Sequence, residues 1–305
     1  MKRDLISLKD LSYKDMEDIF LLTKEIKKNK HRFSSALRGK ILGLIFEKPS
    51  CRTRVSFEVS MFELGGYSIY LGPQEINLGI RESIKDVAQT LSRYLHGIVI
   101  RTFAHGNVIE MAKYASIPVI NGLSDFSHPC QVLSDLYTIK EKFKKLKGIK
   151  LTYVGDGNNN VCHSLLYACP KVGINLRIAC PSKYAPDSNV VKEAERLADS
   201  QGSIIELFNC PFEAVKDADI IYTDVWTSMG KESERDIRRK IFRNFQVNKN
   251  LLSYNKKNCL IMHCLPAHRG EEITDEIIDS KNSIVFDQAE NRLYIHKAIL
   301  IRLLK

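Results

Sequence analysis

The sequence lacks closely spaced cysteine pairs. It contains no C-x-x-C motif, and its eight cysteines are scattered at positions 51, 130, 162, 169, 180, 210, 259 and 264. A secreted disulfide framework or a thioredoxin-type redox site usually shows regular or paired spacings instead. This absence favours reduced thiols in a cytoplasmic compartment.

Long apolar runs are missing as well. No stretch approaches the roughly 20 residues that a membrane-spanning helix needs. Residues 1–5 carry an early acid and no apolar core, so we expect neither a secretory nor a transit peptide. We therefore predict no membrane partner.

Positive charge is in surplus, with 46 Lys and Arg against 36 Asp and Glu and a net charge of +10. The surplus lies in runs at residues 24–32, 140–150 and 235–243, which also contain Glu or apolar residues at helical spacing. That pattern is typical of solvated helix faces. A nucleic-acid surface would interleave basic with aromatic side chains on one face, so we predict no nucleic-acid partner. The basic field favours anionic small substrates.

Strand-like and helix-like segments alternate along the chain. The clearest buried-strand patterns are at 41–46, 97–101, 150–154 and 175–179. Three helix starts show a cap residue with an acid three positions later: Ser12 with Asp15, Ser83 with Asp86, and Asn107 with Glu110. Repeated strand-then-helix order predicts an α/β protein with parallel sheets.

A length of 305 residues suits two domains of about 150 residues each. We predict two doubly wound parallel-sheet domains, at residues 1–148 and 149–286, joined by a linker helix at 131–147. A C-terminal helix at 287–305 is expected to pack back on the first domain. In such folds ligands bind at the carboxyl ends of the strands, so the active site is expected in the crevice between the domains.

The segment from Ser50 to Arg54 follows an apolar strand directly and opens a helical pattern. It concentrates two guanidinium groups and two hydroxyl groups at a helix start. The first turn of a helix has unpaired N–H groups and the positive end of the dipole, so it binds phosphate readily. Arg adds planar, bidentate donors for phosphate oxygens. We interpret this turn as a phosphate site, although a solvated basic helix cap is an alternative.

Further polar clusters fall at predicted strand ends. They are Arg101, residues 128–131, residues 155–160, residues 224–230 and residues 263–266. Any one of these clusters alone could be an ordinary polar loop. Several clusters at the same edge of a sheet indicate a functional site.

Two other motifs lack residues that their usual functions require. Gly155 and Gly157 follow a strand as in a dinucleotide loop, but the third glycine position is Asn160 and no clear acid ends the next strand. His263, Cys264 and His268 suggest zinc but have no convincing fourth ligand. We predict neither a cofactor nor a metal.

Four motifs together resemble the ornithine carbamoyltransferase family over essentially the whole chain. They are Ser50-x-Arg52-Thr53-Arg54, His128-Pro129-Cys130-Gln131, Asp224-x-x-x-Ser228-Met229-Gly230 and His263-Cys264-Leu265-Pro266. The first two and Arg101 are shared with aspartate carbamoyltransferases. The Ser228-Met229-Gly230 loop and the His-Cys-Leu-Pro turn are the ornithine-specific features of the family.

The resemblance implies an enzyme that transfers the carbamoyl group of carbamoyl phosphate to the side-chain amine of L-ornithine, giving citrulline and phosphate for arginine biosynthesis. The implied carbamoyl phosphate-binding residues are Ser50, Cys51, Arg52, Thr53, Asn77, Arg101, His128, Gln131, Cys264, Leu265 and Arg292. The implied ornithine-binding residues are Asn160, Asp224, Ser228 and Met229. Arg101, His128, Asp224 and Cys264 are the implied catalytic residues.

Two positions depart from the family pattern. Cys51 stands where the family usually has Thr, and a thiol is a poorer hydrogen-bond partner than a hydroxyl. Asn77 stands where the family commonly supplies Gln or His from a neighbouring subunit. A side chain supplied by a neighbouring subunit implies a homotrimer with shared active sites. The Asn side chain is shorter than Gln, so whether it reaches the neighbouring site is in question.

Residues 231–236 are highly polar and show no core pattern. We interpret them as a surface loop that the family uses as a lid over ornithine. Acceptors other than ornithine are open at this point, because carbamoyltransferases for aspartate or N-acylated ornithine share the first half. The Ser228-Met229-Gly230 loop argues against both.

Overall fold

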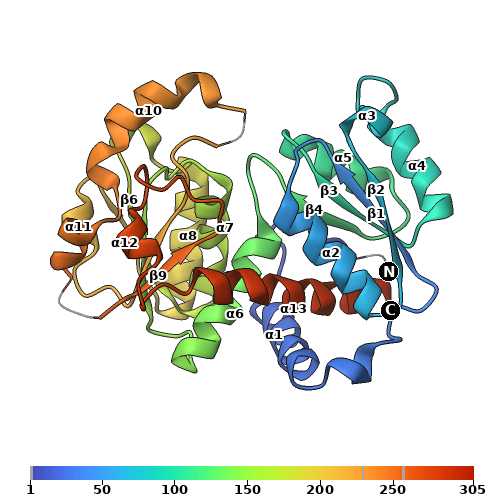
Figure 1. Cartoon of the computed structure of the whole chain (residues 1–305), viewed down its shortest axis with the longest axis horizontal. Helices are drawn as coiled ribbons and strands as arrows, with labels where there is room; N and C mark the ends of the chain where they lie inside the picture. The colour runs from blue at the N-terminus through green and yellow to red at the C-terminus, as the bar shows by residue number, and fades with distance from the viewer. Residues whose placement is uncertain (1–2, 229, 256–257) are drawn as a thin grey trace. The chain divides into compact units, whose positions relative to one another are not determined.

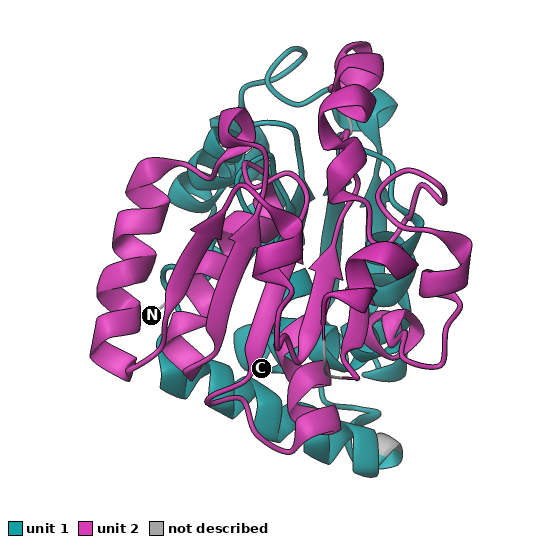
Figure 2. Cartoon of the chain, turned by 90° about the vertical axis from the view of Figure 1, so that its left-hand side faces the viewer, with its two compact units in different colours: residues 1–134, 290–305 teal, residues 135–289 magenta. Residues whose placement is uncertain are grey.

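A computed structural model describes residues 3–228, 230–255 and 258–305. The chain divides into two compact units, one of residues 1–134 with 290–305 and one of residues 135–289 (Figure 2). Each unit is built on one parallel sheet with helices, which confirms the predicted fold class of two parallel-sheet α/β domains. The boundary between the units falls inside helix α6 (Pro129–Phe143), upstream of the division that we predicted at residue 148.

The first unit contains a four-stranded sheet in the order β2-β1-β3-β4 (Figure 1). Its strands are β1 (Ile41–Phe46), β2 (Tyr67–Leu71), β3 (Gly97–Arg101) and β4 (Val119–Leu123). Its helices are α1 (Tyr13–Lys28), α2 (Cys51–Glu63), α3 (Pro73–Ile76), α4 (Ile84–Tyr94), α5 (His105–Tyr114) and most of α13 (Val285–Leu304), with the 3-10 turn η1 (Lys30–Phe33).

The second unit contains a five-stranded sheet in the order β7-β6-β5-β8-β9. Its strands are β5 (Lys150–Val154), β6 (Asn175–Ala179), β7 (Ile205–Phe208), β8 (Ile220–Thr223) and β9 (Leu260–His263). Its helices are α7 (Asn160–Ala168), α8 (Ser188–Gln201), α9 (Pro211–Ala214), α10 (Arg235–Phe242), α11 (Lys249–Ser253) and α12 (Asp275–Ile278). Four 3-10 turns complete it: η2 (Pro170–Val172), η3 (Ser182–Tyr184), η4 (Glu232–Glu234) and η5 (Arg243–Phe245).

The central strands are apolar because helices cover both faces of a parallel sheet. All residues of β3 are buried, as are five of the six residues of β1. The strands predicted at 41–46, 97–101, 150–154 and 175–179 are confirmed at those bounds. Where polar turn residues flank an apolar run, the sequence pattern alone predicts where the strand begins and ends.

Each sheet has a point where the strand order reverses direction, and ligands bind beside such points in open α/β sheets. In the first unit the reversal lies between β1 and β3, so the loops that follow these strands flank it. Ser50 follows β1, and Arg101 is the last residue of β3. In the second unit it lies between β5 and β8. Asn160 begins the helix that follows β5, and Asp224 lies in the loop after β8. The topology of each sheet thus brings predicted site residues together.

Two predicted helix ends are wrong. Helix α5 begins at His105, not at Asn107, because the Asp125 carboxylate accepts from the His105 backbone amide at 2.9 Å. The Asn107 side chain instead donates to Thr102 Oγ1 at 3.0 Å. The linker helix ends at Phe143, since Lys144 takes a left-handed φ of 63° that stops the helix.

The polar segment at 231–236 is more ordered than predicted. Glu232–Glu234 form a 3-10 turn and Arg235 begins helix α10. The basic run at 235–243 also differs from a fully solvated face, because Arg238 is only 3% exposed. Among the described residues, no helix is long and apolar enough to cross a membrane.

Candidate active site

The turn that we predicted to bind phosphate is the start of helix α2 in the first unit. Ser50 is its N-cap, and the Ser50 hydroxyl accepts from the Thr53 amide at 3.2 Å. The first turn contains no acidic residue that would occupy the positive end of the helix. Cys51, the first helical residue, is exposed. The turn therefore has the local structure of an anion site, with amides of the first turn and the Arg52 guanidinium available to one ligand.

Arg292 joins this turn from the far end of the chain. Its Nη2 donates to Thr53 Oγ1 at 3.0 Å, and both side chains are buried. Helix α13 carries Arg292 and also contacts α1 and α2 through Arg302 and Lys297 (Figure 1). Packing of α13 inside the first unit thus fixes a guanidinium beside the phosphate turn.

His128 lies among cations. Burial lowers the pKa of its imidazole well below the ordinary value, and the charges of Arg292, Arg101 and Arg52 lower it further. The ring is therefore neutral at physiological pH and offers one N–H donor and one acceptor. A neutral donor that is surrounded by fixed positive charge suits a carbonyl oxygen on which negative charge develops.

Arg101 and Gln131 complete the buried set of the first unit. Arg101 is the last residue of β3 and is 5% exposed, while Gln131 lies in the first turn of α6 and is 1% exposed. Both side chains are therefore shielded from bulk water. Hydrogen bonds to a ligand are stronger in such a buried environment than on the surface.

Asn77 is placed differently from these residues. It is exposed in the loop after α3, and its φ of 40° lies in the left-handed region. Asn adopts that conformation more readily than most residues other than glycine. Its carbonyl accepts from the amides of Ile80 and Arg81, so it shapes its own loop. The structure thus gives Asn77 a backbone role in its own loop.

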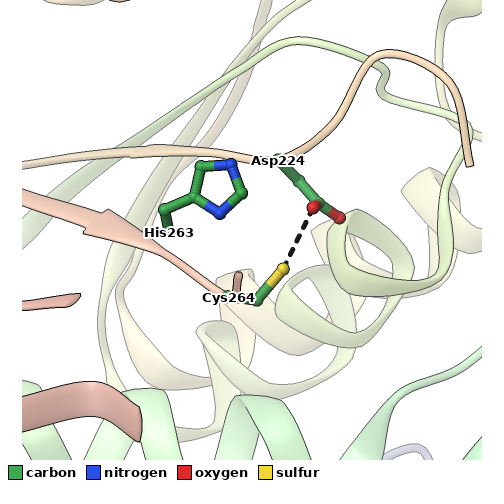
Figure 3. Close-up of side chains that lie close together, drawn as sticks. All are labelled: Asp224, His263 and Cys264. Atoms are coloured by element: carbon green, nitrogen blue, oxygen red, sulfur yellow. Dashed lines mark hydrogen bonds between the residues drawn. The ribbon is translucent and has the colours of Figure 1, made fainter. Parts of the chain in front are cut away.

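In the second unit, Asp224 and Cys264 meet at the ends of β8 and β9. The Cys264 thiol donates to Asp224 Oδ1 at 3.0 Å, and the Val225 amide donates to the same oxygen at 2.8 Å (Figure 3). Burial raises the pKa of the Asp224 carboxyl. A cation brought against this carboxylate would stabilise its ionised form, so the pair is suited to an ammonium ligand.

Asn159 contributes to this cluster, and our sequence analysis missed it. It is the N-cap of α7, and its amide lies 3.5 Å from Asp224 Oδ2 and 2.6 Å from the Tyr153 hydroxyl. The predicted Asn160 is the first residue of α7. The run of three asparagines before an apolar helix contained the signal, because Asn is a strong N-cap residue. Ser228 is half-buried in the loop after β8, and Met229 lies outside the described residues.

Cys264 and Leu265 belong to the second unit, although the family resemblance adds them to the carbamoyl phosphate set. Leu265 has a φ of 55° and precedes a cis proline. Asp224, His263 and Cys264 offer three possible metal-ligating atoms within 4.8 Å of one another. Both nitrogens of His263 are already hydrogen-bonded, however, to the Leu265 amide and to Glu272. A metal ion would have to displace one of these bonds.

Comparison with known proteins accounts for both units. A family model described as the carbamoyl-P binding domain of aspartate/ornithine carbamoyltransferase matches residues 3–141, and one described as the Asp/Orn binding domain matches residues 147–303. The chain belongs to the ornithine carbamoyltransferase family. The resemblance predicted from the motifs is thereby confirmed.

Relatives that carry this family name match nearly end to end. An ornithine carbamoyltransferase from Thermococcus kodakarensis is 54% identical over 98% of this chain and 95% of its own length. A catabolic one from Thermoplasma volcanium is 48% identical over 99% of both chains. The solved structure of ornithine carbamoyltransferase from Pyrococcus furiosus has a TM-score of 0.96 and 52% identity, covering 99% of this chain and 97% of its own.

Proposed function

We propose that the chain transfers the carbamoyl group of carbamoyl phosphate to the side-chain amine of L-ornithine, giving L-citrulline and phosphate. One observation carries the proposal. Two half-sites of complementary chemistry stand at the reversal points of the two sheets, one cationic around His128 and one anionic around Asp224. An anionic acyl phosphate fits the first, and an amino acid with an ammonium group fits the second.

In the first half-site, the Ser50 turn and Arg52 hold the phosphate. Arg101, His128 and Thr53 donate to the carbonyl oxygen, and Gln131 binds the carbamoyl amide. The fixed cations stabilise the charge that develops on the leaving phosphate, and donors on the carbonyl oxygen stabilise the tetrahedral intermediate. Loss of one such donor typically costs about 10²–10³ in rate.

In the second half-site, Asp224 pairs with the α-ammonium of ornithine. Asn160, Ser228 and Met229 complete the substrate contacts, and the side-chain amine lies near Cys264. The reacting amine must be neutral, whereas a free alkylammonium has a pKa near 10.4. Pairing the acid with the α-ammonium leaves the side-chain nitrogen free to lose its proton.

The reaction forms one C–N bond and breaks one C–O bond. The neutral amine attacks the carbonyl carbon, the intermediate collapses with departure of phosphate, and the nitrogen gives up one proton. Closure of the segment that follows β8 would exclude water from the labile acyl phosphate.

The test is citrulline formation from carbamoyl phosphate with four acceptors: ornithine, aspartate, putrescine and N-acetylornithine. Strong preference for ornithine is the expected result. Preference for aspartate or N-acetylornithine would overturn the roles given to Asp224 and Ser228, while leaving the phosphate half-site intact. No turnover with any acceptor would refute the enzyme assignment.

We also propose a homotrimer with shared active sites. Four large apolar side chains are exposed on α2 and on the edge strand β2: Val55, Phe62, Tyr67 and Ile69. Phe62 is 80% exposed, and such a group of apolar side chains favours burial against another copy. Sedimentation of the wild type should give a trimer, and Phe62→Glu should lower both mass and activity. A fully active monomer would contradict shared sites.

Cytoplasmic arginine biosynthesis is the setting that we propose. The eight cysteines are all free thiols, which supports a reducing compartment. Relatives include one named anabolic, from Pyrococcus furiosus, and one named catabolic, from Thermoplasma volcanium. The direction of flux therefore has to be measured from the ratio of forward and reverse rates.

A further inference from the structure

The turn after β9 has a backbone conformation that needs support. Leu265 has a φ of 55°, which is rare and costly for a residue other than glycine. Such conformations persist only where surrounding bonds hold them in place. The neighbouring residue is Cys264, whose thiol faces Asp224 (Figure 3). The bonds that hold Leu265 therefore also determine where this thiol points.

The first of these bonds comes from His263, whose side chain is completely buried. Its Nδ1 lies 2.9 Å from the Leu265 amide, which has only a proton to donate. Nδ1 must therefore be the acceptor. The proton of a neutral ring is then on Nε2, which donates to Glu272 Oε1 at 3.0 Å. The two bonds select one tautomer of His263.

Glu272 closes the other end of the same turn. It is also completely buried, and its Oε1 accepts from the His268 backbone amide at 2.6 Å. One carboxylate oxygen thus connects the His263 ring to the end of the 264–268 segment. The turn is tied at Leu265 through the ring and at His268 through the carboxylate.

The backbone of His263 is anchored independently. Gln288 Oε1 accepts from the His263 amide at 3.1 Å, and Gln288 Nε2 donates to Asp135 Oδ1 at 2.7 Å. The Asp135 carboxylate also accepts from the Tyr222 hydroxyl at 3.0 Å. The imidazole therefore projects from a fixed strand end, and it transmits that position to the turn.

We propose that His263 and Glu272 are positioning residues, which fix the Leu265 backbone and aim the Cys264 thiol at the acceptor site. This inference rests on the proposed function for its kinetic consequence. Neither side chain touches substrate in this assignment. Each acts through a backbone amide of the turn, so a change in either alters how the second substrate is held in the transition state.

Two substitutions at His263 separate its two bonds. Asn places an oxygen near the position of Nδ1, so His263→Asn keeps an acceptor for the Leu265 amide and loses the link to Glu272. Gln places its amide near Nε2, so His263→Gln keeps the link and loses the acceptor. We expect His263→Gln to lower kcat about 100-fold, as a displacement of about 1 Å can do. We expect His263→Asn to lower kcat less than tenfold.

Glu272→Gln tests the second residue. It retains an oxygen that can accept from His263 and His268, so kcat should stay within about fivefold of the wild type. Glu272→Ala removes the shared acceptor and should lower kcat as strongly as His263→Gln. Because the family resemblance places Cys264 and Leu265 in the carbamoyl phosphate set, carbamoyl phosphate KM should rise in His263→Gln and Glu272→Ala and stay nearly constant in His263→Asn and Glu272→Gln.

A control distinguishes positioning from loss of stability. Val247 is buried, and its amide donates to the Glu272 carbonyl at 2.8 Å. Val247→Ala removes packing next to Glu272 but leaves every bond of the turn in place. It should lower the melting temperature without lowering kcat per folded molecule. If His263→Gln behaves like Val247→Ala, the pair is only structural and the proposal is wrong.

A measurement that needs no turnover completes the test. Alkylation of Cys264 by iodoacetamide, read by peptide mass spectrometry, should change in rate at least threefold in His263→Gln and stay constant in His263→Asn. NMR of the ¹⁵N-labelled wild type should show His263 as the Nε2–H tautomer. An Nδ1–H tautomer, or equal Cys264 labelling in all variants, would overturn the positioning role. Failure of the wild type to carbamoylate ornithine would instead sink the proposed function, and these two readouts would still decide the inference.

Discussion

Arg292 donates a hydrogen bond to Thr53 across 239 positions of sequence, at 3.0 Å and with both side chains buried. Thr53 lies in the first turn of α2, and Arg292 lies on the C-terminal helix. The threonine hydroxyl thus accepts from the protein while its own proton is available to a ligand. This bond makes the C-terminal helix a part of the proposed phosphate half-site.

Thr53→Val should disrupt that half-site at nearly constant volume. The variant removes the acceptor of Arg292 and one donor to the carbonyl oxygen, so kcat/KM for carbamoyl phosphate should fall about 100-fold. Thr53→Ser keeps the hydroxyl and should stay within about tenfold of the wild type. Steady-state kinetics in both substrates would check this. Equal losses in Val and Ser would show that the methyl group matters rather than the bond.

Stability should fall in mild acid because of buried histidines. Burial, with Arg292, lowers the pKa of His296 well below its ordinary value, and His128 behaves alike. Below about pH 6.5 these two imidazoles bind protons in the unfolded chain but stay neutral in the folded chain. The free energy of unfolding therefore decreases as pH falls. Each histidine contributes a slope of about 1.4 kcal/mol per pH unit.

His296→Phe isolates one of these contributions. The ring of His296 stacks on Phe57 at 3.8 Å, so an aromatic replacement fits the contact. Urea unfolding between pH 5 and 7.5 should show similar slopes near pH 7.5 and, as pH falls below about 6.5, a slope that becomes smaller than in the wild type by up to about 1.4 kcal/mol per pH unit. An unchanged slope would contradict a neutral, buried His296.

Arg238 should be needed for ornithine binding rather than for carbamoyl phosphate. Its Nη1 donates to Asp156 Oδ2 at 2.7 Å and to the Trp226 carbonyl at 2.9 Å, which joins the loops after β5 and β8. These loops carry the predicted ornithine contacts. A second guanidinium nitrogen, Nε, donates to Glu234 at 2.8 Å. The single ammonium of Arg238→Lys cannot make the Nη1 and Nε contacts together, so ornithine KM should rise about tenfold.

The neighbouring Arg239 provides the matched control for that prediction. It pairs with Glu271 at 2.9 Å but is half-exposed, so Arg239→Lys should leave both KM values unchanged. Kinetics with each substrate varied would separate the two arginines. A rise in carbamoyl phosphate KM alone would refute the role of Arg238.

Cys51→Thr should tighten carbamoyl phosphate binding. Cys51 is the exposed first residue of α2, and a hydroxyl there adds a better hydrogen-bond partner than a thiol. One additional hydrogen bond of about 1 kcal/mol corresponds to about a fivefold lower dissociation constant. Calorimetric titration with carbamoyl phosphate would measure it. Unchanged or weaker affinity would show that Cys51 binds through its backbone alone.

The strands could be predicted well because their signal is local. The strand at 41–46 is a short apolar run that ends at a polar turn, and capping residues at Ser12 and Ser83 mark helix starts by equally local signals. The helix start predicted at Asn107 is wrong because the carboxylate of Asp125, from another loop, accepts from the first turn of that helix instead. A capping residue that is distant in sequence cannot be recognised from the residues next to the helix start.

Local sequence patterns were enough to predict the two parallel-sheet domains and the residue types at their strand ends, because hydrophobic periodicity and turn chemistry act over a few residues. Tertiary structure decided which of those residues share an environment. It placed Arg292 on Thr53, Asn159 beside Asp224 and Arg238 in the interior. It also gave His263 a buried carboxylate partner. Contacts of this kind depend on how distant elements pack, and burial then fixes their protonation and hydrogen bonding.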